Sequence, residues 1–263
     1  MRKILRSPIV KGVARWANKQ PFIWDGIYES FDQAPVIGHG FASDAWLSDM
    51  ERYTRSAVAA IGNAKIPENV PQYHALLASL VASFDSNTDR PVRVLDFGGG
   101  MGIGFANLIR CAAAKSHVEY LVVDNEPSCA RGRQLLQDFP SVTFTTRLTT
   151  EPAAVDIVVL SGVLQFVEDY EELLTNLARF KPTLWLFTFL PAGDIPTFVS
   201  AQRNVPGSIL PVWFFNLGEL VENLDALGYK LVFKSALDRV FDMSNFPPAH
   251  QLHRQCNLLF RRQ

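Results

Sequence analysis

The sequence lacks the features that define several classes of protein. Its three cysteines, Cys111, Cys129 and Cys256, are widely spaced and never form a CxxC pair, so we expect free, buried thiols rather than disulfides or a zinc site. No apolar run approaches the length of a membrane span, and no small-residue cleavage site follows the N-terminal stretch. The histidines show no H-x-x-x-H or H-E-x-x-H spacing, so we expect no metal site.

An excess of charge is also absent. The formal net charge is −1, which gives no indication of a nucleic-acid partner. Basic and apolar side chains nevertheless alternate over residues 2–19, before the first acidic residue, Asp25. This segment fits either a solvated basic tail or a short amphipathic element on an anionic membrane surface. We therefore expect a cytoplasmic protein, with peripheral contact at the inner face of the membrane as an alternative.

Apolar residues make up 48% of the chain, which is enough for a sizeable core. From residue 91 onward, runs typical of buried strands alternate with amphipathic helical segments. We expect strands near 92–96, 118–124, 141–145, 155–160, 183–189, 229–235 and 255–261, and helices near 103–115, 127–138 and 169–179 and after Asn216. Alternation of this kind predicts an α/β fold with a doubly wound parallel sheet.

The most informative segment spans residues 92–104. A strand ends in Asp96, glycines follow at 98, 99, 100 and 102, and a helix comes next, which is how a nucleotide-binding βαβ unit begins. The dinucleotide pattern G-x-G-x-x-G fails, because Ile103 stands at its third glycine position. Because Asp96 would repel a phosphate and attract a cation, the segment points to a positively charged nucleoside without phosphate.

This segment resembles motif I of class I S-adenosylmethionine-dependent methyltransferases, with the pattern D-x-G-x-G-x-G at Asp96, Gly98, Gly100 and Gly102. The resemblance implies that the glycine loop, Gly99 included, wraps the amino acid part of the cofactor. It also implies that Asp96 acts on the methionine ammonium, usually through water. Ordinary turns use glycine as well, so a plain turn stays open as an interpretation.

Two later segments add to this pattern. Asp124 ends the second strand 22 residues after Gly102, where an acid can bind both ribose hydroxyls, although Asp124 or Asn125 could equally cap the following helix. Ser161, Gly162 and Gln165 follow a buried strand and resemble motif IV, which lies beside the methyl-transfer centre. That segment can also be a plain parallel strand and its connection.

Three stretches together resemble an uncharacterised methyltransferase family encoded among bacterial surface-polysaccharide (O-antigen) genes. They are residues 24–34 with 40–41, residues 95–102 with 160–165, and residues 202–206 with 213–215 and 228–229. The resemblance implies a Rossmann-like seven-stranded sheet whose last strand inserts antiparallel. It also implies a small-molecule or saccharide acceptor and a role in polysaccharide synthesis. The chain departs from that family where Asp124 replaces an expected Glu and Phe189 an expected Arg.

On this basis we divide the chain in two. Residues 1–90 form the basic segment, irregular to about residue 40, and a helical cover. That cover holds two amphipathic helices, over 43–61, with Ser48 and Glu51 as a capping box, and near 76–84. Residues 91–263 form the S-adenosylmethionine-binding domain. Its apolar insert, 191–215, is too long for an ordinary loop and is predicted to be a lid, an acceptor pocket or a self-packed surface loop.

The residues that would carry catalysis are the least defined. Methyl transfer to a hydroxyl needs a base, and His39 and Asp44 in the N-terminal cover are candidates. Gln202 could orient an acceptor but cannot act as a base, and Tyr28 could close over the cofactor. Two other functions stay open, an NAD-dependent oxidoreductase and a non-catalytic binding module with this fold. The sequence indicates no oligomeric state.

Overall fold

The computed structural model describes residues 22–61, 72–85, 90–111, 117–149, 153–203, 205 and 207–263, and the statements below concern these residues. The basic segment 2–19, with its predicted membrane contact, lies outside them. Within this part of the chain, no helix combines the length and the apolar character that crossing a bilayer requires.

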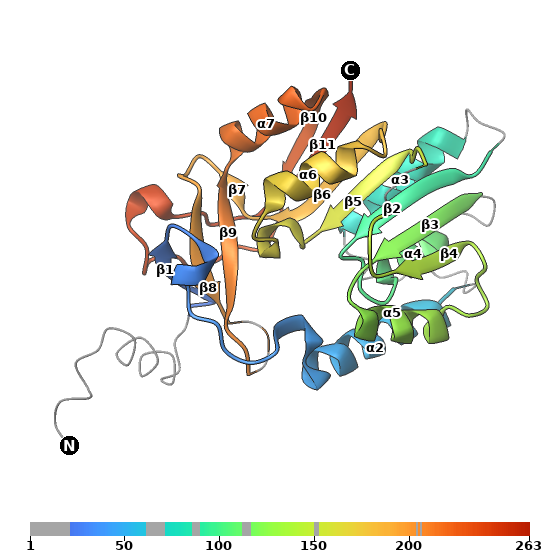
Figure 1. Cartoon of the computed structure of the whole chain (residues 1–263), viewed down its shortest axis with the longest axis horizontal. Coiled ribbons are helices and arrows are strands. Elements are labelled where there is room, and N and C mark those ends of the chain that lie inside the picture. Colours follow the sequence, from blue (N-terminus) through green and yellow to red (C-terminus); the bar gives the residue numbers. More distant parts are fainter. Residues whose placement is uncertain are drawn as a thin grey trace.

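The main sheet has seven strands in the order β10-β11-β6-β5-β2-β3-β4 (Figure 1). The strands are β2 (Val92–Phe97), β3 (Val118–Val123), β4 (Val142–Thr145), β5 (Ile157–Ser161), β6 (Leu184–Leu190), β10 (Tyr229–Ala236) and β11 (Cys256–Arg262). Strands β2 to β6 are parallel, and β11 lies antiparallel between β6 and β10. The predicted Rossmann-like sheet with an antiparallel final strand is confirmed.

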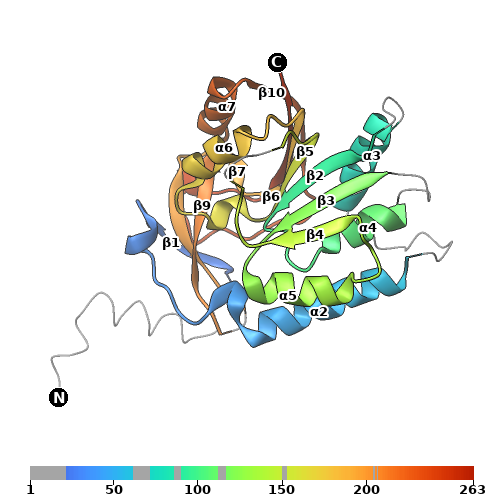
Figure 2. The same cartoon turned by 45° about the vertical axis from the view of Figure 1, so that its right-hand side comes forward.

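Helices cover both faces of this sheet, because side chains alternate between the faces along each strand. On one face, Val94 and Val122 pack with α3 (Gln72–Asp85) and α4 (Ile103–Cys111). On the other, Leu95 and Val158 pack with α6 (Tyr170–Ala178) and α7 (Leu217–Ala226). The helix α5 (Glu126–Leu135) connects the parallel strands β3 and β4. The helix α2 (Asp44–Ala59) lies along α5 (Figures 1 and 2).

A second, four-stranded sheet stands beside the main one, in the order β1-β8-β9-β7 (Figure 2). It joins β1 (Trp24–Tyr28) to β7 (Ala192–Gly193), β8 (Phe198–Gln202) and β9 (Leu210–Asn216). The insert 191–215 is therefore mostly strand, and β8 is buried along its whole length. The aromatic core of this part comprises Trp24, Phe198, Phe214, Phe241 and Phe246.

Three local predictions are wrong. Residues 24–28, within the segment predicted to be irregular, form the strand β1, which pairs antiparallel with β8. The helix α2 begins after Ser43, whose hydroxyl accepts from the Trp46 amide, so Ser48 does not cap it. Cys111, the last residue of α4, is exposed rather than buried, while Cys129 and Cys256 are buried free thiols. By contrast, Asn216 caps α7 as expected, its side chain accepting from the Glu219 amide.

Candidate functional site

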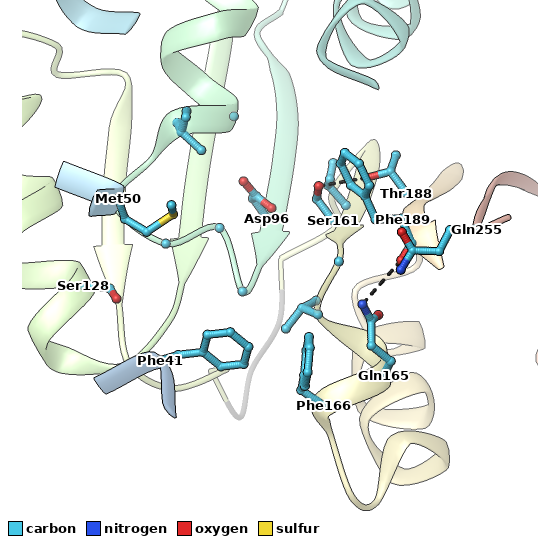
Figure 3. A pocket seen from close by; sticks show the side chains of 18 of the residues that line it. Phe41, Met50, Asp96, Ser128, Ser161, Gln165, Phe166, Thr188, Phe189 and Gln255 are labelled. Atoms are coloured by element: carbon cyan, nitrogen blue, oxygen red, sulfur yellow. Dashed lines mark hydrogen bonds between the residues drawn. The ribbon is translucent and has the colours of Figure 1, made fainter. Parts of the chain in front are cut away.

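A cavity of about 550 Å³ opens at the carboxyl ends of β2, β5 and β6. In open α/β sheets this edge is where ligands bind, because loops rather than side chains of the sheet close it. Asp96, Ser161 and Thr188, one near the end of each strand, all face the cavity (Figure 3). Its remaining walls come from the glycine turn, the N-terminal cover and the second sheet.

The glycine turn forms one wall. Gly98, Gly100 and Gly102 have φ values of 72°, 60° and 83°, in the left-handed region that side chains disfavour. A Cβ at Gly98 would collide with the Val163 side chain, whereas a Cβ at Gly100 would meet nothing within 4 Å. The first glycine therefore serves close packing, and the second keeps open space at the cavity wall.

Asp96 lies at the centre of this wall. It is 3% exposed, its Oδ2 accepts a hydrogen bond of 2.7 Å from the Tyr120 hydroxyl, and its buried Oδ1 has no protein partner. Burial raises the pKa of Asp96 to about 7, and repulsion from Asp124 adds to this although the Tyr120 hydrogen bond opposes it. Oδ1 therefore receives no hydrogen bond from the protein, and a cation that donated to it would hold the carboxylate ionised.

Asp124 supports the same turn from behind. Its Oδ2 accepts from the Gly100 amide at 2.8 Å, and its Oδ1 accepts from the backbone and side-chain nitrogens of Asn125 at 2.7 and 2.8 Å. Asn125 itself caps α5, since its Oδ1 accepts from the Ser128 amide. Neither residue lines the cavity, whereas Ser128 does. Because each carboxylate oxygen has two lone pairs, these three hydrogen bonds leave Asp124 one acceptor position, on Oδ2, for a ribose hydroxyl, and that role stays a prediction.

The opposite wall carries the motif IV residues. Ser161, Gly162 and Gln165 all line the cavity, and the Thr188 hydroxyl donates to Ser161 Oγ at 2.8 Å. Gln165 is 4% exposed, and its Nε2 donates a long hydrogen bond of 3.4 Å to the Phe189 carbonyl. Its Oε1 is buried without a protein partner and can accept from a ligand (Figure 3).

Phe189 was not predicted as a site residue, yet its ring lines this wall. Its φ is 54°, which is rare for an aromatic residue and costs about 1–3 kcal/mol. Backbone strain of this kind persists where the surroundings over-determine it, and it is common at binding sites. A residue type alone does not reveal such a conformation, so no signal in the sequence could have found it.

The mouth of the cavity is aromatic. Phe41 packs on Trp46 and Phe166 with ring centroids 5.1 and 4.7 Å apart, which joins the N-terminal cover to the main sheet. From the second sheet come Trp24 and Gln202, linked by a buried hydrogen bond of 2.6 Å from Trp24 Nε1 to Gln202 Oε1. Arg239, Phe241 and Gln255 also line the cavity.

The remaining predicted site residues lie elsewhere. Gln202 is the one catalytic candidate that lines the cavity, since His39 and Asp44 are exposed on the N-terminal cover and are not part of its lining. Tyr28 packs against Ala201 and Ile209 of the second sheet, away from the lining. The structure thus brings together Asp96, Gly98, Gly99, Gly100, Ser161, Gly162, Gln165 and Gln202. Gly102 is not part of the lining, and a Cβ there would meet the Leu136 side chain.

S-Adenosylmethionine fits the chemistry of this cavity. Its amino acid part carries an ammonium, and its sulfonium is a second cation. A buried carboxylate oxygen without a protein partner needs such a group, whereas a pyrophosphate would meet repulsion. The Gly100 amide, which a pyrophosphate would need, already donates to Asp124.

Comparisons with known proteins agree. The sequence profile of the methyltransferase domain matches residues 70–256. A search of curated proteins finds no match. Among solved structures, the 1,6-didemethyltoxoflavin-N1-methyltransferase of Burkholderia thailandensis, with its substrate and S-adenosylhomocysteine, is 19% identical. That similarity covers 86% of this chain and 95% of that chain, with a TM-score of 0.53.

Two further structures have the same fold. Magnesium protoporphyrin IX methyltransferase from Synechocystis PCC 6803, with bound S-adenosylhomocysteine, is 14% identical, covering 84% of this chain and 97% of that chain, with a TM-score of 0.51. The N-terminal domain of EvdMO1, with S-adenosylhomocysteine and D-fucose, is 15% identical, covering 82% and 97%, with a TM-score of 0.51. At these identities the structures support the fold, and the profile match identifies the family. The chain therefore belongs to the methyltransferase domain family.

Proposed function

We propose that this chain transfers a methyl group from S-adenosylmethionine to a small-molecule acceptor, and that Asp96 binds the ammonium of the cofactor. The observation that carries this proposal is the Asp96 carboxylate, which is buried in the cavity wall with Oδ1 unpartnered. Gly98, Gly99, Gly100 and Gly102 would surround the methionine end, and Asp124, next to Asn125, would bind the ribose. Ser161, Gly162 and Gln165 would border the reacting centre.

When bound, the cofactor would supply an activated methyl group to the acceptor atom, with the electron pair of the carbon–sulfur bond left on sulfur. An acceptor O–H or N–H would release its proton to solvent, because neither His39 nor Asp44 lines the cavity. The contribution of the chain is alignment, which can be worth about 7–11 kcal/mol. Phe189 and Gln165 would orient the acceptor from the main sheet, and Gln202 from the second sheet. The aromatic mouth formed by Phe41 and Phe166 would exclude water.

The acceptor side of the cavity supports a molecule with a flat or apolar face. Phe189 stands where the resemblance leads us to expect an arginine, so an aromatic face replaces a positive charge. Gln165 offers a buried amide oxygen, which selects for an acceptor that carries an O–H or N–H donor.

A saccharide is the second candidate acceptor. Aromatic rings beside amide side chains suit the apolar face and the hydroxyls of a sugar, and Phe189, Gln165 and Gln202 provide both. A role in surface-polysaccharide synthesis rests on the resemblance to the O-antigen-associated family. A cytoplasmic location and membrane contact through residues 2–19 likewise stay predictions.

Calorimetric titration with S-adenosylmethionine, S-adenosylhomocysteine and NAD tests the cofactor. We expect both adenosyl compounds to bind and NAD not to bind. Binding of NAD alone would support the oxidoreductase alternative, and binding of none of the three would support a non-catalytic module. Release of S-adenosylhomocysteine in the presence of sugar nucleotides or planar heterocycles then separates the acceptor classes.

A further inference from the structure

Tyr120 is the second titratable side chain of the turn wall, and the proposed function gives it no role. It is 1% exposed in the middle of β3, and its hydroxyl donates to Asp96 Oδ2 at 2.7 Å. The sheet register explains this contact, because Tyr120 pairs with Val94 and Asp96 lies two residues further along the same face. Because residues two apart in a strand point to the same side, Tyr120 and Asp96 are diagonal neighbours on one face of the sheet, and the tyrosine ring reaches from one strand to the other.

The surrounding backbone leaves room for this contact and nothing larger. A Cβ at Gly104, in the first turn of α4, would lie 2.6 Å from the Tyr120 hydroxyl and 2.9 Å from Asp96 Oδ2. A Cβ at Gly99 would lie 2.5 Å from the same carboxylate oxygen. Glycine is a poor helix former, so its presence at 104 indicates a packing requirement, which the Tyr120 hydroxyl supplies.

We propose, on the basis of the proposed cofactor site, that Tyr120 is a positioning residue: its hydroxyl holds Asp96 Oδ2, directs Oδ1 toward the cofactor ammonium and favours the ionised carboxylate. Gly104 leaves the space that this hydrogen bond needs, because it has no Cβ. Cofactor binding below neutral pH is then coupled to the loss of a proton from Asp96.

The charges around Asp96 are few. Asp124, at the end of β3, repels the Asp96 carboxylate, and Tyr120 donates to it. Arg239 is the other charged side chain that lines the cavity in the described part of the chain. Burial is the main reason why the pKa of Asp96 is raised to about 7, and the Tyr120 hydrogen bond holds it below the value that burial alone would produce. Removal of the hydroxyl should therefore raise the pKa of Asp96 further.

The test is the affinity for S-adenosylhomocysteine of the full chain and of Tyr120→Phe, measured by calorimetry from pH 5.5 to 9. The amine of the ligand is protonated to the same extent in both measurements at each pH. Its effect therefore cancels in the ratio of the two dissociation constants, which reports the protonation of the protein alone. We expect Tyr120→Phe to bind about tenfold more weakly near pH 6 and the ratio to fall to a small constant by pH 9. A ratio that does not change with pH would overturn the proposal, because a merely structural role weakens binding uniformly.

Tyr229→Phe is the matched control. Tyr229 is also a buried tyrosine, 2% exposed, but it packs on Trp185 in the core between the main sheet and α7. We expect an affinity ratio near one at every pH for this variant. Should the unmodified chain bind neither S-adenosylmethionine nor S-adenosylhomocysteine, the proposed function itself fails, and that result is distinct from a flat ratio.

A second measurement tests the role of Gly104. Gly104→Ala should weaken binding of S-adenosylhomocysteine about tenfold or more in the unmodified chain, because its methyl group displaces the Tyr120 hydroxyl. In the Tyr120→Phe background the same substitution should cost less, because the 2.6 Å contact with the hydroxyl is gone and the 2.9 Å contact with Asp96 Oδ2 is the close contact that remains. An equal loss in both backgrounds would show that Gly104 serves something other than this hydrogen bond.

Discussion

The cavity has two walls that are built in different ways. The turn wall, residues 96–104 with Tyr120 and Asp124, comes from one βαβ unit, and its groups are ionisable or backbone amides. The sheet wall, Trp24, Phe189, Gln202 and Phe241, comes from four distant segments, and its groups are aromatic rings and an amide. Local sequence determines the first wall, whereas tertiary packing assembles the second.

The difference is also electrostatic. The turn wall contains a buried carboxylate without a full set of partners, so the folded chain is less stable than it would be without that charge. The sheet wall is held by contacts such as the stacked rings of Phe198 and Phe214, 4.9 Å apart, behind its surface. Binding of a cation should therefore depend on the turn wall, and selection among acceptors on the sheet wall.

Asp96→Asn is expected to have the largest effect, and it should change ligand affinity and stability in opposite directions. Affinity for S-adenosylhomocysteine should fall about 100-fold at pH 8, because a charge-assisted hydrogen bond is lost. The free energy of unfolding without ligand should rise by roughly 1–3 kcal/mol at that pH, since a buried charge is removed. Calorimetry and urea denaturation measure the two effects. A variant that loses both binding and stability would contradict this assignment.

The sign of the pH dependence follows from the same carboxyl group. Its folded-state pKa, about 7, lies above the ordinary value of 3.8, so the folded state holds a proton that the unfolded state has released between these values. The contribution of Asp96 to stability is therefore fully present below about pH 4 and is lost as pH rises to about 7. Asp96→Asn should abolish this part of the pH dependence.

Gly98→Ala and Gly100→Ala form a matched pair within the turn wall. Both glycines have left-handed φ, so each substitution should cost roughly 1–3 kcal/mol of stability in strain. Only Gly98→Ala adds a collision, with Val163, so it should be clearly the less stable variant. Gly100→Ala places its methyl group in open space at the cavity, so it should fold and bind S-adenosylhomocysteine about tenfold more weakly. Unchanged affinity in Gly100→Ala would place the cofactor elsewhere.

The turn wall and the main sheet could be predicted from the sequence because their signals are local. Residues 92–104 contain strand, carboxylate, glycines and helix in one continuous run, and the strand–helix alternation follows apolar periodicity. The strand β1 could not be predicted in the same way. It is five residues long with Gly26 at its centre, and its partner β8 lies more than 170 residues away, as the Trp24–Gln202 bond shows by its separation of 178.

Tyr120 and Phe189 show two further reasons why parts of the site could not be predicted from the sequence. Tyr120 lies in an apolar run, where its ring looks like any buried strand residue, and the register that brings it to Asp96 is a property of the folded sheet. The left-handed φ of Phe189 is a backbone conformation that the residue type does not reveal. Sequence motifs therefore predicted the cofactor side of the cavity and missed most of the acceptor side.

Phe189→Gly tests the independence of the sheet wall. Glycine accepts the left-handed φ without strain, so the released backbone strain should partly offset the lost packing of the phenylalanine ring. Stability should therefore fall less than in Phe189→Leu, which keeps the strain. Affinity for S-adenosylhomocysteine should stay within about threefold of that of the unmodified chain in both variants. The rate of methyl transfer should fall about tenfold, because the acceptor loses its contact with the aromatic ring. Denaturation, calorimetry and turnover report these separately. A large loss of cofactor affinity would show that the two walls are not independent.

Trp24→Phe should have the smallest effect on the cofactor, because it changes the sheet wall and leaves the turn wall as it is. The substitution removes the donor to Gln202 Oε1, a buried oxygen, and should cost roughly 1–3 kcal/mol in the free energy of unfolding. Trp213→Phe is the control, since its indole donates to the Glu168 carbonyl at an exposed site, where water can replace it. Affinity for S-adenosylhomocysteine should stay unchanged in both variants. Turnover should fall severalfold only in Trp24→Phe, because Gln202 loses the hydrogen bond from Trp24 and orients the acceptor less well. Equal turnover in the two variants would mean that the tie between β1 and β8 stabilises the fold without serving the acceptor.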